Sequence, residues 1–395
     1  MSQQLINRNP DLKRLRDEGY HIEVKGGYLV IHHIPYVNSR KEVHIGKLVT
    51  VLVLRDPETV ASPDNHVIFF FGEFPHYPNG EKIAALVHQD ENRALEEGVV
   101  VNYSFSNKPK NGFSNYFDKV KSYADIISHQ AIAIDPEVTA TPFNVVTDED
   151  PESVFHYLDT NSSRANINML NAKFKGQKIA IVGLGGTGAY ILDMVAKTQV
   201  QEIHLFDGDE LLLHNAFRSP GAASVELLKT KPKKANYYHS LYSNMHKHVK
   251  SHPYYVNENN ISELNGMSYV FICVDKNLIR KSIMDHLLRM NIPFIDVGLG
   301  VNTVGGENDC LVGTIRTTIG TQEKCDHLSS RVPTGDNDNN EYGTNIQVAD
   351  LNNLNAVLAV MKWKKMTGFY QDLEKEHHLT YSINVAQLLN EDLAT

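Results

Sequence analysis

The stretch from Lys178 to Asp209, KIAIVGLGGTGAYILDMVAKTQVQEIHLFDGD, decides the fold of this chain. Its first apolar run, 179–182, predicts a buried parallel strand, and apolar residues at helical spacing follow after a turn. The turn is rich in glycine and contains Gly183, Gly185, Gly186 and Gly188. A second apolar strand, 203–206, ends on Asp207.

This order of strand, glycine-rich turn, helix and acid-tipped strand favours a nucleotide site. Glycines allow backbone N–H groups to approach phosphates at a helix N-terminus, and the acid can accept hydrogen bonds from ribose hydroxyls. The alternative is a tight glycine turn inside an ordinary βαβ unit. The position of Asp207 argues against that alternative.

Length and composition limit the possible classes of function. The chain has 395 residues, enough for two or three domains, and a net charge of −9 with no long run of one sign. We therefore expect neither a nucleic-acid partner nor a membrane surface. The N-terminus lacks the apolar core of a signal peptide, and no window approaches the roughly 20 apolar residues that span a bilayer. The three cysteines form no CxxC pair, so we expect a reducing, cytoplasmic environment.

Residues 1–148 are predicted to form a smaller α+β domain. A short helix at 10–16 precedes a β-rich region that ends near Phe105, and helical spacing returns at 117–132. The acids and histidines of this domain form no recognisable constellation, so we expect a recognition role. The polar stretch VTDEDP, 146–151, predicts the boundary with a second domain.

The second domain, 149–395, continues as repeated βα units. These units predict an α/β fold, a doubly wound Rossmann-like domain, whose strand ends carry ligands on one edge of the sheet. A helical segment is expected at 154–174, before the central strand. A loop near 320–344, rich in Gly, Asp and Asn, precedes a helix at 348–366.

Charged residues follow successive strands in an order that distinguishes between nucleotides. After the second strand come an acid, an amide, an arginine and a lysine-rich turn. These are Asp209, Asn215, Arg218 and residues 229–234. A later strand ends at Asp275. On adjacent strand tips they would supply cations for a triphosphate and an acid for Mg²⁺, whereas NAD requires far less positive charge.

The segments GLGGTG, LFDGDELLLHNAFR, TKPKKA and ICVDKNLIR resemble, in this order, the motifs of the ThiF-type adenylyltransferases. This superfamily contains the ubiquitin-activating enzymes and the activators of sulfur-carrier proteins. The resemblance covers about half of the chain, from Phe174 to Phe369. The family pattern is GxGGxG, D-x-D, N-x-x-R-Q, G-x-x-K and T-D-N, and the spacing from acid to arginine agrees with it.

The resemblance implies roles for individual residues. Asp207 would hold the ribose of ATP, and Asp209 would lie beside the metal or the nucleotide. The phosphates would be bound by Asn215, Arg218 and Lys233. Lys231 is the rival of Lys233, because the turn is rich in lysine. Asp275 would place Mg²⁺.

The chain departs from the family pattern after two of these residues. The glutamine usual after the phosphate-binding arginine is Ser219, and the asparagine usual after the metal-site aspartate is Lys276. The structural zinc cysteines of many relatives are absent. None of these changes removes a phosphate or metal contact, so adenylylation remains the expected activity.

The mechanism implied is attack of a modifier's C-terminal carboxylate on the α-phosphate of ATP, giving an acyl-adenylate and pyrophosphate. The modifier would be a ubiquitin-like or sulfur-carrier protein with a C-terminal glycine, and a downstream conjugating protein would bind the N-terminal domain. A thioester step needs an exposed thiolate. Cys325 is the candidate, because Lys324 precedes it and His327 follows two residues later. The alternative is a loop cysteine without a role.

Arg164 resembles the arginine that family dimers lend to the neighbouring active site, which implies a homodimer. Two other classes of function compete with the adenylyltransferase reading. A NAD-dependent oxidoreductase is disfavoured because no catalytic His, Tyr–Lys or Cys pairing emerges. A non-catalytic partner of an activating enzyme would be expected to lose Arg218, Lys233 or Asp275, and all of them are present.

Overall fold

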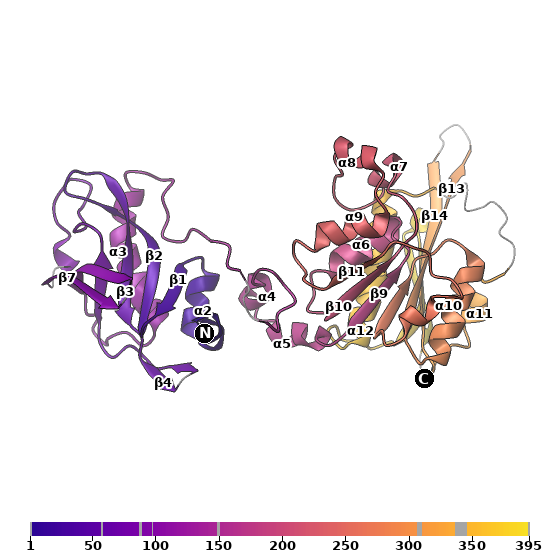
Figure 1. The fold of residues 1–395 in the computed structure, drawn as a ribbon, viewed down its shortest axis with the longest axis horizontal. Coiled ribbons are helices and arrows are strands. Elements are labelled where there is room, and N and C mark those ends of the chain that lie inside the picture. Colours follow the sequence, from indigo (N-terminus) through magenta and orange to yellow (C-terminus); the bar gives the residue numbers. More distant parts are fainter. Residues whose placement is uncertain are drawn as a thin grey trace. The chain divides into compact units, whose positions relative to one another are not determined.

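The computed structural model describes residues 2–56, 58–86, 89–96, 98–147, 151–305, 310–335 and 346–393. The chain divides into two compact units (Figure 1). The first unit contains residues 1–151 and 158–165, and the second contains 152–157 and 166–395. The predicted boundary between residues 148 and 149 lies outside the described residues and stays a prediction.

A six-stranded antiparallel sheet forms the centre of the first unit. In spatial order its strands are β1 (His21–Lys25), β2 (Tyr28–Val37), β3 (Val43–Val51), β6 (Val67–Phe71), β8 (Val99–Ser106) and β7 (Gln89–Glu96). The other elements are α1 (Ser2–Arg8), α2 (Pro10–Asp17), α3 (Tyr116–Ile132), α4 (Thr160–Arg164) and the small pair β4 (Leu54–Asp56) and β5 (Thr59–Val60). Val120 and Tyr123 of α3 are buried in one core with Phe70 and Phe105 of the sheet. The sheet-rich first domain is therefore confirmed.

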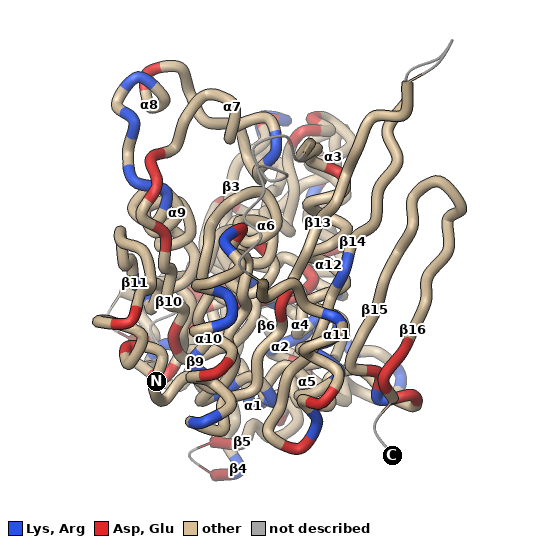
Figure 2. Tube along the Cα trace, turned by 90° about the vertical axis from the view of Figure 1, so that its right-hand side faces the viewer, with Lys and Arg blue, Asp and Glu red and all other residues tan. Residues whose placement is uncertain are grey.

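The second unit contains an eight-stranded mixed sheet. In spatial order its strands are β11 (Val249–His252), β10 (Glu202–Phe206), β9 (Lys178–Val182), β12 (Tyr269–Ile272), β13 (Phe294–Val304), β14 (Cys310–Gly320), β15 (Glu376–Ser382) and β16 (Gln387–Leu393). The pairs from β11 to β13 are parallel, and those from β13 to β16 are antiparallel. Figure 2 shows β13 and β14 continuing as a hairpin arm beyond their neighbours.

Helices cover both faces of this sheet (Figure 1). They are α5 (Asn168–Asn171), α6 (Gly186–Val195), α7 (Leu213–Ala216), α8 (Val225–Thr230), α9 (Lys234–Tyr242), α10 (Asn277–Arg289), α11 (Leu328–Arg331) and α12 (Ala349–Met366). Alternate side chains of β9 enter two cores, as a strand buried on both faces requires. Ile179 and Ile181 pack with residues of α6, α9 and α12, whereas Ala180 and Val182 pack with residues of α10.

The strand order reverses beside β9. β10 and β11 follow on one side of β9, and β12 and β13 continue on the other side. Parallel strands that diverge in this way leave a crevice at their carboxyl ends, where doubly wound proteins bind ligands. The prediction of a doubly wound domain is confirmed.

The segment before the central strand differs from the sequence-based expectation. Residues 154–174 do not form one helix, because Asn166 has a φ of +56°, a left-handed conformation that ends α4 before α5 begins. Of the expected loop near 320–344, residues 336–344 lie outside the described residues. Among the described residues, no helix is both long enough and apolar enough to cross a membrane.

Candidate functional site

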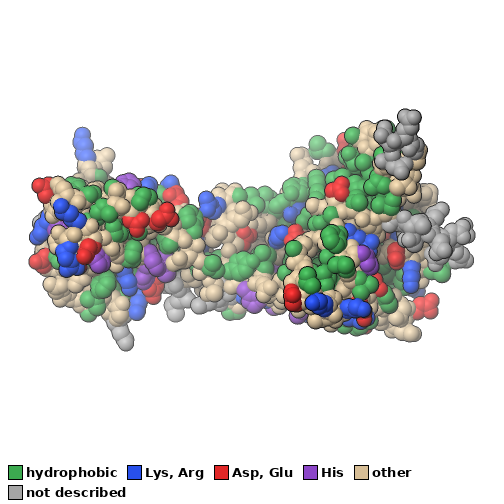
Figure 3. All heavy atoms as spheres, turned by 90° about the horizontal axis from the view of Figure 1, so that it is seen from above, with side chains coloured by type: hydrophobic (Ala, Val, Ile, Leu, Met, Phe, Trp, Pro, Cys, Tyr) green, Lys and Arg blue, Asp and Glu red, His purple; other side chains and the backbone are tan. Residues whose placement is uncertain are grey.

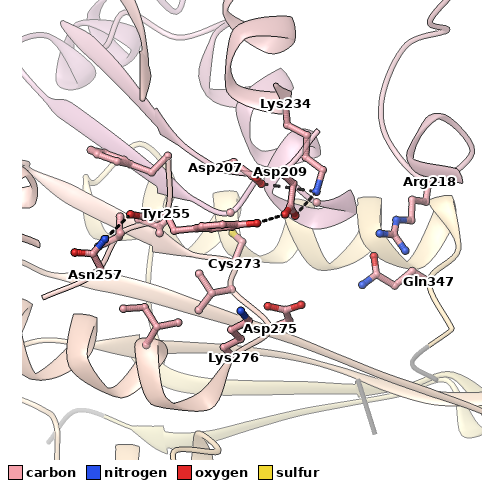
Figure 4. A pocket seen from close by; sticks show the side chains of 17 residues that line it. Asp207, Asp209, Arg218, Lys234, Tyr255, Asn257, Cys273, Asp275, Lys276 and Gln347 are labelled. Carbon is pink, nitrogen blue, oxygen red and sulfur yellow. Dashed lines mark hydrogen bonds and ion pairs between the residues drawn. The ribbon is translucent and has the colours of Figure 1, made fainter. Parts of the chain in front are cut away.

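A cavity of about 380 Å³ lies at the switch point, at the carboxyl ends of β9, β10 and β12 (Figure 4). The turns after these strands line it, together with the segments that follow β11 and precede α12. Its charged lining residues are Asp207, Asp209, Arg218, Lys234, Asp275 and Lys276. Four of these residues, Asp207, Asp209, Arg218 and Asp275, were predicted from the sequence and line one cavity.

The glycine-rich turn forms the wall between β9 and α6. Gly183 has a φ of +93°, and a Cβ atom there would lie 2.5 Å from the carbonyl oxygen of Cys273. A Cβ atom on Gly188 would lie 1.9 Å from the carbonyl oxygen of Gly183. Gly185 differs, because a Cβ atom there would meet nothing within 4 Å and the residue lines the cavity. Gly183 and Gly188 therefore close the turn, and Gly185 leaves room for a ligand.

Asp207 organises the two adjacent turns. Its side chain is 6% exposed, and it accepts hydrogen bonds from the backbone N–H groups of Leu184 at 2.6 Å and of Asp209 at 2.8 Å. Burial raises the pKa of Asp207, although Lys234 and these N–H donors oppose the shift. The carboxylate thus holds the glycine-rich turn against the next strand end and faces the cavity.

Asp209 belongs to a small network across the cavity wall (Figure 4). The Lys234 ammonium lies 2.7 Å from Asp209 and 4.0 Å from Asp207, and the Tyr255 hydroxyl donates to Asp209. Burial favours a higher pKa for Asp209, but the hydrogen bonds from Lys234 and Tyr255 outweigh it and lower the pKa. The bond to Asp209 raises the pKa of Tyr255 to about 12.

Arg218 faces the cavity from the loop after α7 (Figure 4). Its Nε atom is buried and has no hydrogen-bond partner in the part of the chain that the structure describes. Burial lowers the pKa of the guanidinium, opposed by Asp209 and Asp275. Asn215 does not line the cavity; its side chain accepts from the Leu212 N–H at 2.8 Å and so fixes the turn that leads to Arg218.

The lysine-rich turn places a different lysine in the cavity from the one that the motif indicates. Lys231 has a φ of +47° and ends α8, and Lys233 donates to the Gly208 carbonyl at 2.8 Å. Neither residue lines the cavity, whereas Lys234 does. The phosphate role of Lys233 stays a prediction. Sequence reasoning missed Lys234 because several lysines are adjacent in this turn, and the motif alone does not indicate which of them enters the cavity.

Asp275 and Lys276 follow β12 and line the cavity side by side (Figure 4). Among the described residues, the Asp275 carboxylate forms no hydrogen bond or ion pair, and no group of at least three His, Cys, Asp or Glu is arranged for a metal ion. Mg²⁺ usually takes one or two carboxylates and completes its shell with water and phosphate oxygens. A free carboxylate beside a phosphate-sized space therefore fits Mg²⁺.

A smaller cavity of about 80 Å³ adjoins the first and shares Gly185, Asp275 and Gln347 with it. Asn352 of α12 lines it, accepts from Thr187 at 3.0 Å and donates to the Arg218 carbonyl at 3.4 Å. Asn352 thereby ties the start of α6 to the loop that carries Arg218. Sequence analysis missed Gln347 and Asn352, because they follow a long loop and carry no local motif.

Cys325 and Arg164 lie elsewhere. Cys325 is exposed in the turn before α11 and does not line the cavity, and the nearby His327 is buried with its Nε2 atom 2.9 Å from the Ile319 carbonyl. Arg164 belongs to the first unit, where its guanidinium lies 5.8 Å from the centroid of the Phe143 ring. The catalytic roles of both stay predictions. The cysteine in the cavity lining is Cys273, and burial raises the pKa of its thiol.

The arrangement suits an anionic nucleotide. Backbone N–H groups at the start of α6 and the free Arg218 guanidinium can bind phosphates, and Asp207 can accept from ribose hydroxyls. Val256 and Ile279 supply an apolar wall that suits a base. The lining can therefore accommodate the phosphates, the ribose and the base of a nucleotide.

Comparisons with known proteins agree with this division of the chain. Residues 162–366 match the model described as the ThiF family, and residues 10–160 match DUF6791, a domain of unknown function. No curated protein matches the chain.

Solved structures show limited similarity. A crystal structure of E. coli MccB and one of E. coli MccB with ATP are 17% and 18% identical to this chain, with TM-scores of 0.45 and 0.44 and 58% of this chain covered in each case. They are matched over 65% and 67% of their own chains, so this chain covers less than two thirds of the first of them. PaaA is 16% identical, with a TM-score of 0.44, and 59% of this chain and 78% of that chain are covered.

Proposed function

Because the chain belongs to the ThiF family, we propose that it is an ATP-dependent adenylyltransferase that activates the C-terminal carboxylate of a ubiquitin-like or sulfur-carrier protein. The observation that carries the proposal is the Arg218 side chain, whose buried Nε atom has no hydrogen-bond partner among the described residues and which faces a cavity bounded by a glycine-rich turn and Asp275. A triphosphate needs such a cation more than a dinucleotide such as NAD does.

The reaction needs positioning and charge stabilisation rather than a general base. A carboxylate oxygen of the modifier attacks the α-phosphorus of ATP, a new P–O bond forms, and the bond to the departing pyrophosphate breaks. Arg218 and the N–H groups around Gly185 bind the phosphates, while Asp207 accepts from the ribose. Asp275 would hold Mg²⁺, which neutralises phosphate charge. Alignment and electrostatic stabilisation supply most of the acceleration.

We further propose a homodimer in which Arg164 serves the site of the second copy. Large apolar side chains around α7 and α8 support a contact surface beside Arg218, since Leu213, Phe217 and Val225 are 65%, 79% and 62% exposed. Figure 3 shows hydrophobic side chains gathered on this side of the second unit. The first unit is proposed to recognise a downstream conjugating protein, and the free state of all three cysteines supports a cytoplasmic location.

Mg-ATP is expected to stabilise the protein, and Asp275→Ala is expected to lose the Mg²⁺-dependent part of that effect. A ligand that binds only the folded state adds about 2.7 kcal/mol at a hundredfold excess over its Kd. This stabilisation is measured by thermal unfolding of the wild type and the variant with ATP, Mg-ATP or NAD. The matched control is Asp285→Ala, an exposed acid of α10 that pairs with Lys281 at 2.9 Å. Stabilisation by NAD but not by ATP would contradict the proposal and favour a NAD-dependent oxidoreductase.

Cys325→Ser is expected to leave ATP–pyrophosphate exchange within about twofold of the wild type, because a solvent-facing side chain away from the cavity contributes little to that step. We propose that its thiolate then attacks the acyl-adenylate carbonyl, forming a thioester and releasing AMP. Loss of a reductant-sensitive conjugate with a ubiquitin-like protein in the variant would support this second step. Cys310→Ser, another exposed cysteine, is the control. A tenfold loss of exchange would contradict the separation of the two steps.

A further inference from the structure

We infer that Lys276 is a second phosphate-binding cation of this cavity and that it makes ATP binding less dependent on Mg²⁺. The inference rests on the proposed function, because it concerns how the same cavity neutralises a triphosphate. Lys276 stands where the family pattern has an uncharged asparagine. It is also outside the set of residues that the motifs indicate for phosphate binding.

The first argument is that Lys276 is not neutralised by the protein. Lys234, another cation of the lining, is 7% exposed and pairs with Asp209 at 2.7 Å. Within the described ranges, the Lys276 ammonium forms neither a hydrogen bond nor an ion pair, and the buried Nε atom of Arg218 also has no hydrogen-bond partner. The cavity therefore presents two cations that can bind an anionic ligand, and one of them is Lys276.

The second argument is that the ammonium has a defined place. The Lys276 Nζ atom lies 5.8 Å from the centroid of the Tyr255 ring, within the range of a cation–π interaction. The ring is itself held, because its hydroxyl donates to Asp209 and a Cβ atom on Gly208 would lie 2.8 Å from it. Figure 4 shows the Lys276 side chain pointing into the cavity beneath this ring. Lys276 is an exposed residue, and this contact places its ammonium at the wall of the cavity, where a ligand can reach it.

The third argument is the position next to Asp275. Lys276 directly follows this residue and lines the same cavity. The charged lining balances three acids, Asp207, Asp209 and Asp275, against Arg218, Lys234 and Lys276. Without Lys276 the lining becomes net negative and repels a triphosphate, and charges in a partly buried cavity interact more strongly than in water. Mg²⁺ at Asp275 offsets that repulsion, so Lys276 matters most when Mg²⁺ is absent.

The test is ATP binding to the full chain by isothermal titration calorimetry, with EDTA and with excess Mg²⁺. Lys276→Asn is expected to raise the Kd for ATP at least about tenfold in EDTA, as expected for a lost charge-assisted contact, but less than about threefold with Mg²⁺. Lys276→Arg should keep the affinity in both conditions, and adenosine, which lacks phosphates, should bind both variants and the wild type equally.

Lys281→Asn is the matched control, since Lys281 is an exposed lysine of α10, the helix that follows Lys276, but is paired with Asp285 and does not line the cavity. Its affinity for ATP should equal that of the wild type. Unchanged affinity of Lys276→Asn in EDTA would overturn the inference and leave the proposed function intact. Weakened binding of adenosine would also overturn it, because that result indicates distortion of the cavity. If the wild type binds ATP in neither condition, the proposed function and this inference fall together.

Discussion

Arg218→Ala is expected to lower the rate of ATP–pyrophosphate exchange about 1000-fold while leaving the stability of the ligand-free protein unchanged. The Nε atom of this arginine is buried without a partner among the described residues, and burial lowers the guanidinium pKa. A desolvated charge without compensation does not stabilise the fold. The same group gains strong, bidentate hydrogen bonds once a phosphate occupies the cavity, so its contribution appears in binding and in the transition state.

Two further variants make this prediction specific. Arg218→Lys keeps the charge but loses the forked donor geometry, so its exchange rate should fall between those of the wild type and the alanine variant. Arg289→Ala is the control, because the Arg289 Nε atom donates to the Asp285 carbonyl on the exposed side of α10 and the residue does not line the cavity. Exchange and thermal unfolding are measured on each variant. A stability loss above about 1 kcal/mol in Arg218→Ala would contradict the assignment and indicate a structural role.

The parts of the site that the sequence predicted are those encoded by local pattern. The short apolar runs of β9 and β10, the glycines between them and the acid at residue 207 lie within one βαβ unit, so their geometry follows from neighbouring residues. Asp275 was predictable for the same reason, because it lies just after β12, the strand that pairs with β9 on its other side. Once the strands are parallel, their carboxyl ends must meet at one edge.

The parts that sequence reasoning missed depend on contacts between distant residues. Tyr255 enters the cavity from the segment after β11, and Gln347 enters from the segment before α12. Neither has a motif, and each is placed by the packing of its element against the sheet. Lys234 lines the cavity in place of the predicted Lys233 for a local reason. The left-handed Lys231 and the start of α9 at Lys234 set which lysine turns toward Asp209.

Gly188→Ala and Gly185→Ala are expected to separate the fold of the glycine-rich turn from its function. A Cβ atom on Gly188 would overlap the Gly183 carbonyl oxygen at 1.9 Å, so α6 must move away from β9. We expect a loss of about 2–3 kcal/mol in the stability of the second unit, the usual cost of overpacking a closed core. Gly185 has a φ of −70° and open space where its Cβ atom would be, so alanine should change stability by less than about 0.5 kcal/mol.

The order of effects reverses when nucleotide is added. Thermal unfolding with and without Mg-ATP should show that Gly185→Ala has lost the stabilisation by ligand, corresponding to at least about a tenfold loss of affinity, because its methyl group projects into the cavity. Gly188→Ala should unfold at a lower temperature than the wild type. The fraction of this variant that folds correctly should still be stabilised by Mg-ATP. If Gly185→Ala binds ATP as the wild type does, the phosphates do not approach this turn, and the position of ATP between Gly185 and Arg218 is wrong. If instead only Gly185→Ala loses binding, ATP occupies the open space beside Gly185, and the turn itself does not need a glycine there to fold.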